Sequence, residues 1–217
     1  MGKYIIVNAD DYGHTRGVSE GIRQAHLNGI VSSTTAMMNR PNAVEALKLA
    51  QRACPNLGLG VHLVLTSGRP RLPAEQVASL LRPDGTFFGY DDFIAHLDEI
   101  SLDEVMAEWR AQIELFVATT GRVPDHLDSH HHSSYFTPAL FERMLGLAQE
   151  YGCTIRKPFG KDSASFADYL PAELAEKYQA EFSGLLMGLQ PVTTQVFIGN
   201  FYDEDATRQN LISILKQ

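Results

Sequence analysis

Three groups of polar side chains in this sequence could bind a metal ion and catalyse hydrolysis. Two consecutive carboxylates, Asp10 and Asp11, follow an apolar run, His62 lies within an apolar segment, and three consecutive histidines begin at His130. Adjacent carboxylates repel each other, and a cation removes this repulsion. One Asp can then bind the metal while its neighbour accepts a proton. The alternative is a turn at the end of a strand, with an Asp side chain that caps the next helix.

The histidines differ in how strongly they indicate a metal site. A lone histidine such as His62 is often a hydrogen-bonded core residue. Three histidines in a row are costly to place in a core, and the alternative for them is an exposed polar loop. If the preceding strand continues through them, a period of two puts Asp128, His130 and His132 on one face and His131 on the other. The pattern leaves His130 and His132 open as ligands and predicts that His131 is packed.

One Asp and two His suit a single borderline divalent ion that keeps open positions for water and substrate. Such an ion lowers the pKa of water and polarises a carbonyl group, and the carboxylate of Asp10 can accept the proton of the water. We therefore predict hydrolysis of an amide or an ester. Arg156 could bind a carboxylate or sugar hydroxyl of the substrate, and a surface ion pair is the alternative.

Short apolar runs alternate with longer segments of helical periodicity, which predicts an α/β fold with βα units around a mostly parallel sheet. In such sheets the functional groups gather where strands end. The predicted strands are Tyr4–Asn8, Ser33–Met38, Leu57–Leu63, His126–Asp128, Thr154–Lys157 and Thr194–Ile198. The predicted helices are Gly17–Asn28, Asn42–Arg52, Leu102–Thr119, Pro138–Tyr151, Pro171–Leu186 and Asp205–Lys216.

Local signals refine two of these elements and one connection. Ser101 and Glu104 predict a capping box at the start of a helix, and Gly152 predicts a helix C-cap. The segment Thr66–Tyr90, rich in Gly and Pro, is too long for an ordinary βα turn. It is either an excursion over the active face or a surface insertion.

Composition excludes several classes of protein. A chain of 217 residues is the length of one mid-sized α/β domain, so we expect a single domain over residues 1–217. The formal net charge of −8, without a cluster of Lys and Arg, argues against a nucleic-acid partner. No apolar run approaches the roughly 20 residues of a membrane span. Two distant cysteines, Cys54 and Cys153, fit a reduced cytoplasmic protein.

Taken together, these motifs resemble the YdjC-like carbohydrate deacetylase family, whose best-known members are chitooligosaccharide deacetylases. The resemblance extends from Lys3 to about Pro158, in the family's order and spacing, and rests on Ile6–Gly13, Gly29–Ala36, Gly60–Leu63 and Pro124–His132. It implies an irregular (β/α) barrel, similar to a TIM barrel with fewer than eight strands. It also implies metal-dependent removal of the acetyl group from N-acetylated sugars or short chitooligosaccharides.

The resemblance also assigns roles to individual residues. It implies that Asp11, His62 and His130 bind one divalent metal ion and that Asp10 is the general base, which selects His130 over His132. Family members are described with Mg, whereas two imidazoles would by softness favour Zn, Co or Ni. The identity of the ion therefore stays open.

The C-terminal part departs from the family. Members carry a late strand that ends in a His-Pro pair and could supply the general acid, whereas no His follows His132 here. We expect either that the last strand of the barrel is missing or that His132 has taken over the acid role. A missing strand would leave a sheet edge that a second subunit could cover, as in a homodimer. The alternative functions are a sugar-binding homologue with little or no activity and a metal-dependent hydrolase of another ester class.

Overall fold

The computed structural model describes residues 4–156, 172–199 and 201–216, and a parallel five-stranded sheet forms its centre. The strands lie side by side in chain order, as β1 (Asn8–Tyr12), β2 (Ser33–Ala36), β3 (Gly58–Leu63), β4 (His126–Ser129) and β5 (Thr154–Ile155). Because consecutive strands are parallel neighbours, each connection crosses back over the same face. The sheet is open in the part described, as in an incomplete (β/α) barrel, which confirms the predicted fold class.

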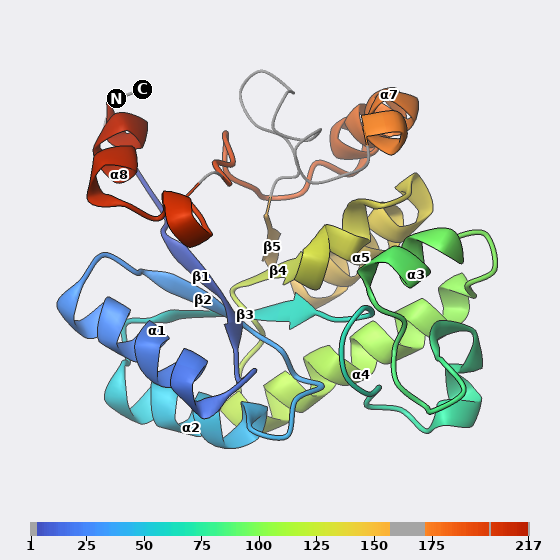
Figure 1. Cartoon of the computed structure of the whole chain (residues 1–217), viewed down its shortest axis with the longest axis horizontal. Helices are drawn as coiled ribbons and strands as arrows, with labels where there is room; N and C mark the ends of the chain where they lie inside the picture. The colour runs from blue at the N-terminus through green and yellow to red at the C-terminus, as the bar shows by residue number, and fades with distance from the viewer. Residues whose placement is uncertain (1–3, 157–171, 200, 217) are drawn as a thin grey trace.

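Helices follow one another around one side of the sheet, as Figure 1 shows. They are α1 (Arg16–Asn28), α2 (Ala43–Ala53), α4 (Leu102–Thr120) and α5 (Pro138–Tyr151). The other helices are α3 (Tyr90–Ala95), α7 (Ala172–Leu189) and α8 (Arg208–Leu215), with 3₁₀ turns at Ala74–Gln76, Ala78–Leu80, His130–Tyr135 and Asp203–Asp205. No helix among the described residues combines the length and apolar character needed to cross a membrane.

Side-chain caps explain where the helices begin and end. Thr137 accepts a hydrogen bond from the backbone N–H of Leu140 at the start of α5, and Gly152 ends this helix with a φ of 65°, as predicted. Ser101 caps α4 through the backbone N–H of Glu104. The predicted capping box is only half formed, because the Glu104 carboxylate accepts hydrogen bonds from Ser79 instead.

Alternation along the strands separates an apolar face from a polar one. In β3, Leu59, Val61 and Leu63 are each at most 2% exposed and belong to the hydrophobic core. His62 points to the opposite face, and the register places it beside Asp128 of β4. The face opposite α1, α2, α4 and α5 is therefore the one that carries the polar groups.

The first predicted strand is wrong in position. The apolar run Tyr4–Ile6 precedes the sheet and is exposed, whereas β1 contains Asp10 and Asp11 rather than ending before them. Apolar character suggested the strand, but the paired register with β2 begins at Asn8, opposite Ser33.

Two further predictions near the C-terminus need correction. Thr194–Ile198 forms no strand. Just before it, Thr193 forms an isolated parallel bridge with Ile155 of β5. The last helix begins at Arg208 rather than Asp205, because Thr207 caps it by accepting from the backbone N–H of Asn210. The predicted ends at Lys157 and Pro171 lie outside the described residues.

Candidate active site

A β-bulge presents both carboxylates of the Asp pair on the polar face. The register between β1 and β2 shifts between Ala9 and Tyr12, and Asp11 within this shift has a φ of 67°. Regular alternation would send two consecutive side chains to opposite faces, whereas an inserted residue changes this order. Asp tolerates the left-handed conformation better than most residues. The bulge thus explains how neighbouring carboxylates can serve one site.

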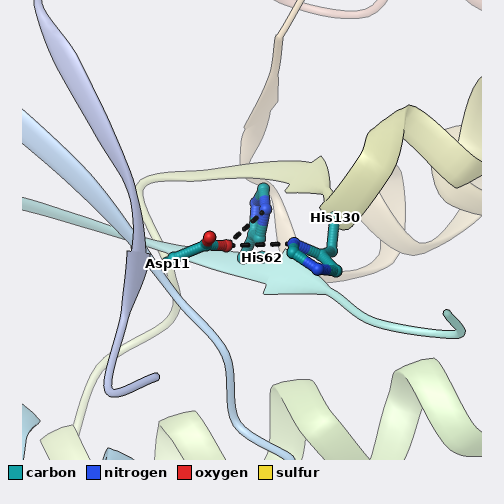
Figure 2. A group of neighbouring side chains, drawn as sticks. All are labelled: Asp11, His62 and His130. Atoms are coloured by element: carbon teal, nitrogen blue, oxygen red, sulfur yellow. Dashed lines mark hydrogen bonds and ion pairs between the residues drawn. The ribbon is translucent and has the colours of Figure 1, made fainter. Parts of the chain in front are cut away.

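Asp11, His62 and His130 come together at the ends of three segments far apart in the sequence. Their ligand atoms all lie within 4.8 Å of one another. Asp11 Oδ1 lies 3.3 Å from His62 Nε2 and 3.0 Å from His130 Nδ1, and Figure 2 shows both imidazoles facing this oxygen. One carboxylate and two imidazoles on one side of a point are a donor set that fits a divalent ion.

The charges at this site also fit a cation. The carboxylates of Asp10, Asp11 and Asp128 and the guanidinium of Arg156 carry a formal charge of −2 together, which a divalent ion would balance with neutral imidazoles. Without an ion, protons on the imidazoles balance part of this negative charge. Burial alone would lower the pKa of His62, but the carboxylates of Asp128 and Asp11 raise it to about 10.

Asp10 has a separate set of partners. Arg156 donates from Nη1 to Asp10 Oδ2 at 2.9 Å and from Nη2 to Oδ1, and Asn8 Nδ2 donates to Oδ1 at 2.7 Å. Burial alone would raise the pKa of Asp10, but the guanidinium of Arg156 holds it well below its usual range. Asp10 is therefore an ionised carboxylate in a fixed orientation.

Arg156 has different partners from those predicted for it. Its guanidinium contacts Asp10 and, at 2.5 Å from Nη2, the Oδ2 atom of Asp128, and its side chain is 10% exposed. The hydroxyl of Tyr135 donates to the Arg156 backbone oxygen at 2.9 Å, and the ring of Phe197 lies 5.2 Å from the guanidinium carbon. These contacts give Arg156 a role within the site, while a role in substrate binding stays a prediction.

A second group of candidate ligands consists of Asp10, His62 and Asp128, whose ligand atoms also lie within 4.8 Å of one another. The guanidinium of Arg156 already lies between the two carboxylates of this group. A metal ion there would have to displace or approach this cation, which Coulomb repulsion opposes. The group with Asp11 and His130 is therefore the better metal site.

The three consecutive histidines do not continue strand β4, so the faces predicted for them from strand periodicity are wrong. β4 ends at Ser129, and the backbone then turns through left-handed residues, His131 with a φ of 54° and His132 with a φ of 56°. His131 is exposed rather than packed, and its ring stacks on that of His130 with 3.9 Å between centroids. A turn of this kind, rather than a strand, presents His130 to Asp11.

His132 does not join the metal-ligand group. Its ring stacks with Tyr135 and lies edge-on to Phe197, each at 6.2 Å between centroids. Burial, together with the positive charge of Arg156, lowers the pKa of His132 to about 4. The imidazole is therefore neutral at pH 7, which makes it a weak proton donor.

The segment from Thr66 to Tyr90 reaches the site at both of its ends. Thr66 Oγ1 lies 3.1 Å from Nδ1 of His131, and the ring of Tyr90 meets His131 edge-on at 5.6 Å between centroids. These contacts support the interpretation as an excursion over the active face. The buried carboxylate of Glu108 holds it to α4, since it accepts from the backbone N–H groups of Arg71 and Leu72.

Asp128, Thr35 and Asn8 were not among the predicted site residues, although each contacts one of them. Asp128 Oδ1 lies 2.6 Å from His62 Nδ1, and Thr35 Oγ1 donates to Asp128 Oδ2 at 3.1 Å. The predicted alternation in β4 already placed Asp128 on the face of the sheet that carries the polar groups. For Thr35 and Asn8 the sequence has no such signal, because their contacts depend on the register between strands.

Comparisons with known proteins identify the family. The model of the YdjC-like protein family matches residues 4–217. A carbohydrate deacetylase of Enterococcus faecalis is 36% identical over 215 residues, covering 98% of this chain and 74% of that protein. A chitooligosaccharide deacetylase of Yersinia enterocolitica is also 36% identical, covering 99% of this chain and 76% of that protein.

A solved structure agrees with these relatives. It belongs to a protein of Enterococcus faecalis V583, provisionally described as a cellobiose-phosphate cleavage protein, with a TM-score of 0.80 and 34% identity over 97% of this chain and 74% of that one. Sequence and fold therefore lead to the same group of proteins, as the motifs predicted. This chain belongs to the YdjC-like protein family.

Proposed function

We propose that this chain is a metal-dependent carbohydrate N-deacetylase that removes the acetyl group from N-acetylated sugars or short chitooligosaccharides. One observation carries the proposal: Asp11 faces two imidazoles, while its neighbour Asp10 is held apart by Arg156. The names of the relatives, carbohydrate deacetylase and chitooligosaccharide deacetylase, supply the substrate class.

In this proposal Asp11, His62 and His130 hold one divalent ion. The ion supplies Lewis acidity, which polarises an oxygen and lowers the pKa of water. Mg is the ion that the family resemblance suggests, and two imidazole ligands favour Zn, Co or Ni. Asp11 is suited to its role because the imidazoles keep its pKa below the usual range despite its burial.

Asp10 acts as the general base. The oxygen of a water molecule attacks the amide carbonyl carbon, and the proton of the water passes to the Asp10 carboxylate. The C–N bond then breaks, so that acetate leaves and the sugar amine takes up a proton. Arg156 binds both oxygens of Asp10 and thereby fixes the direction in which the base faces.

His132 remains the proposed donor of the proton to the amine. It lies beside Tyr135 and Phe197, outside the metal-ligand group of Asp11, His62 and His130. Its low pKa means that the charged form is scarce at pH 7, so the ring would donate efficiently only if it gained a proton during the reaction.

We further propose that the enzyme works in the cytoplasm as a homodimer. Cys54 and Cys153 are free thiols, which agrees with a reducing compartment. Among the described residues, β1 pairs with β2 alone, and Ile5 and Ile6 ahead of it are 55% and 62% exposed. Light scattering should give twice the chain mass of 24.0 kDa, and a mass of one chain at all concentrations would contradict the dimer.

The activity is tested by acetate release from N-acetylglucosamine and its short oligomers. The metal-free protein is loaded with Mg, Zn, Co or Ni in turn, and acetate and free amine are both measured. We expect equal amounts of the two products with at least one ion, and none after chelation. Hydrolysis of p-nitrophenyl phosphate without any deacetylation would instead favour a phosphoesterase.

A further inference from the structure

We propose that Asp128 is a positioning residue that joins the metal-ligand group to the general base, an inference that rests on the metal site proposed above. Asp128 lies in the middle of β4 and is 0% exposed. A buried carboxylate is costly unless each oxygen has partners. The two oxygens of Asp128 have different partners, and each partner leads to a different part of the site.

The first oxygen of Asp128 orients His62. Oδ1 lies 2.6 Å from His62 Nδ1, while Nε2 of the same ring faces Asp11. With a carboxylate at Nδ1, that nitrogen carries the proton, and Nε2 is the one free to bind an ion. Carboxylates that contact a ligating imidazole fix its tautomer and raise its basicity.

The second oxygen of Asp128 holds Arg156. Oδ2 lies 2.5 Å from Arg156 Nη2, and the same guanidinium binds both oxygens of Asp10. Arg156 is thus fixed between two carboxylates of separate strands. Without Asp128, the guanidinium would lose one of the two anchors that define its position, and the orientation of Asp10 would lose its support.

Thr35 keeps the Asp128 carboxylate in this orientation. Its hydroxyl donates to Asp128 Oδ2 at 3.1 Å, lies 3.3 Å from His62 Nδ1, and accepts from Asn8 Nδ2 at 3.3 Å. Thr35 is also 0% exposed, so water does not replace this contact. The orientation of Asp128 therefore depends on a donor from a third strand, β2.

The test is Asp128→Asn, which preserves shape but removes the charge. His62 and Arg156 contact different oxygens of Asp128. An amide replaces one of these oxygens with an NH₂ group, which only donates, so one of the two partners loses its acceptor. The control is Asp125→Asn, which removes a charge three residues earlier and keeps an oxygen for the backbone N–H of Leu59. Binding of Zn²⁺ alone to each metal-free protein is measured by chelator competition, together with its melting temperature.

We expect Asp128→Asn to weaken Zn²⁺ binding roughly 10- to 100-fold, the range found for residues that support metal ligands. At saturating Zn²⁺, kcat for acetate release should also fall, with a smaller change in KM, because the base is misplaced. Asp125→Asn should bind Zn²⁺ as the wild type does. Zn²⁺ binding by Asp128→Asn within twofold of the wild type would overturn the inference.

The binding measurement separates this inference from the proposed activity. If the wild type releases no acetate but Asp128→Asn still weakens Zn²⁺ binding, the deacetylase proposal fails and the positioning role stands. If Asp128→Asn does not fold, Thr35→Val takes its place, with Thr35→Ser as its matched control. We expect Thr35→Val to weaken Zn²⁺ binding roughly three- to tenfold and Thr35→Ser to restore it, and wild-type affinity in Thr35→Val would overturn the inference.

Discussion

Asp10 and Asp11 are chemically identical neighbours, and their different hydrogen-bond partners suit them to different roles. Asp11 faces imidazoles and Asp10 faces a guanidinium, because the bulge in β1 turns the second carboxylate toward His62 and His130. Two carboxylates with different partners commonly have different roles in catalysis. The pKa of each is held below its ordinary range by these partners, so both are ionised at pH 7.

The pKa of His62 predicts that metal binding releases a proton. Because this pKa is raised to about 10, the metal-free protein carries a proton on each ring nitrogen of His62 at pH 7. The ion can bind only after one proton leaves, so affinity should rise about tenfold per pH unit below pH 10. Calorimetric titration with Zn²⁺ between pH 6 and about pH 8, in buffers of different ionisation enthalpy, measures the number released.

We expect release of about one proton per ion at pH 7. His131→Gln is the control, because His131 stacks on His130 but does not belong to the group of candidate ligands, and this variant should release the same number of protons. An affinity that does not change with pH, or binding without proton release, would show that His62 is not the ligand that titrates.

At the scale of secondary structure, Gly60 allows β3 and β4 to approach on the polar face. A Cβ atom at Gly60 would lie 2.6 Å from the backbone oxygen of His126 and 2.7 Å from its ring. Gly60→Ala should therefore destabilise the protein by about 1–3 kcal/mol through overpacking. It should also disturb the contact between His126 Nε2 and Asn8.

Gly146→Ala is the matched control for this prediction. Gly146 lies exposed within α5, and nothing lies within 4 Å of a Cβ atom there. Because alanine favours the helix, this substitution should stabilise the protein by about 0.5–1 kcal/mol. Denaturant unfolding measures both variants. Equal effects of the same sign would contradict the close approach of β3 and β4.

The elements that the sequence predicted well are those whose signals are local. Helix α5 has both predicted ends, because a Thr cap, a Pro in the first turn and a C-terminal Gly all lie at its boundaries. β1 was misplaced because a bulged strand with consecutive carboxylates does not look apolar. The pairing of Arg156 with Asp10 spans 146 residues and depends on the fold, so no local pattern could predict it.

At the scale of the whole molecule, the site is assembled from every strand of the sheet. β1 contributes Asp10 and Asp11, β2 contributes Thr35, β3 contributes His62, β4 contributes Asp128, and Arg156 directly follows β5. The candidate ligands Asp11 and His130 are 119 residues apart in the sequence. An ion held by them is bound only when the sheet is formed, so binding and folding should be coupled.

This coupling predicts that the ion raises the melting temperature. A ligand that binds only the folded state at 100 times its Kd stabilises that state by about 2.7 kcal/mol. Differential scanning calorimetry of the metal-free protein, with and without saturating Zn²⁺, should show the increase, and a chelator should reverse it. Asp11→Asn should melt at the same temperature with and without the ion, and an equal increase in this variant would contradict the ligand set.

The central claim is that Asp11 holds the ion while Asp10 acts as the base, and a comparison of Asp10→Asn with Asp11→Asn tests it most directly. Metal content and acetate release from N-acetylglucosamine oligomers are measured on the same samples. Asp10→Asn should keep one ion per chain and lose on the order of 10²- to 10⁴-fold in kcat, whereas Asp11→Asn should lose both ion and activity. Wild-type turnover in Asp10→Asn would contradict the account.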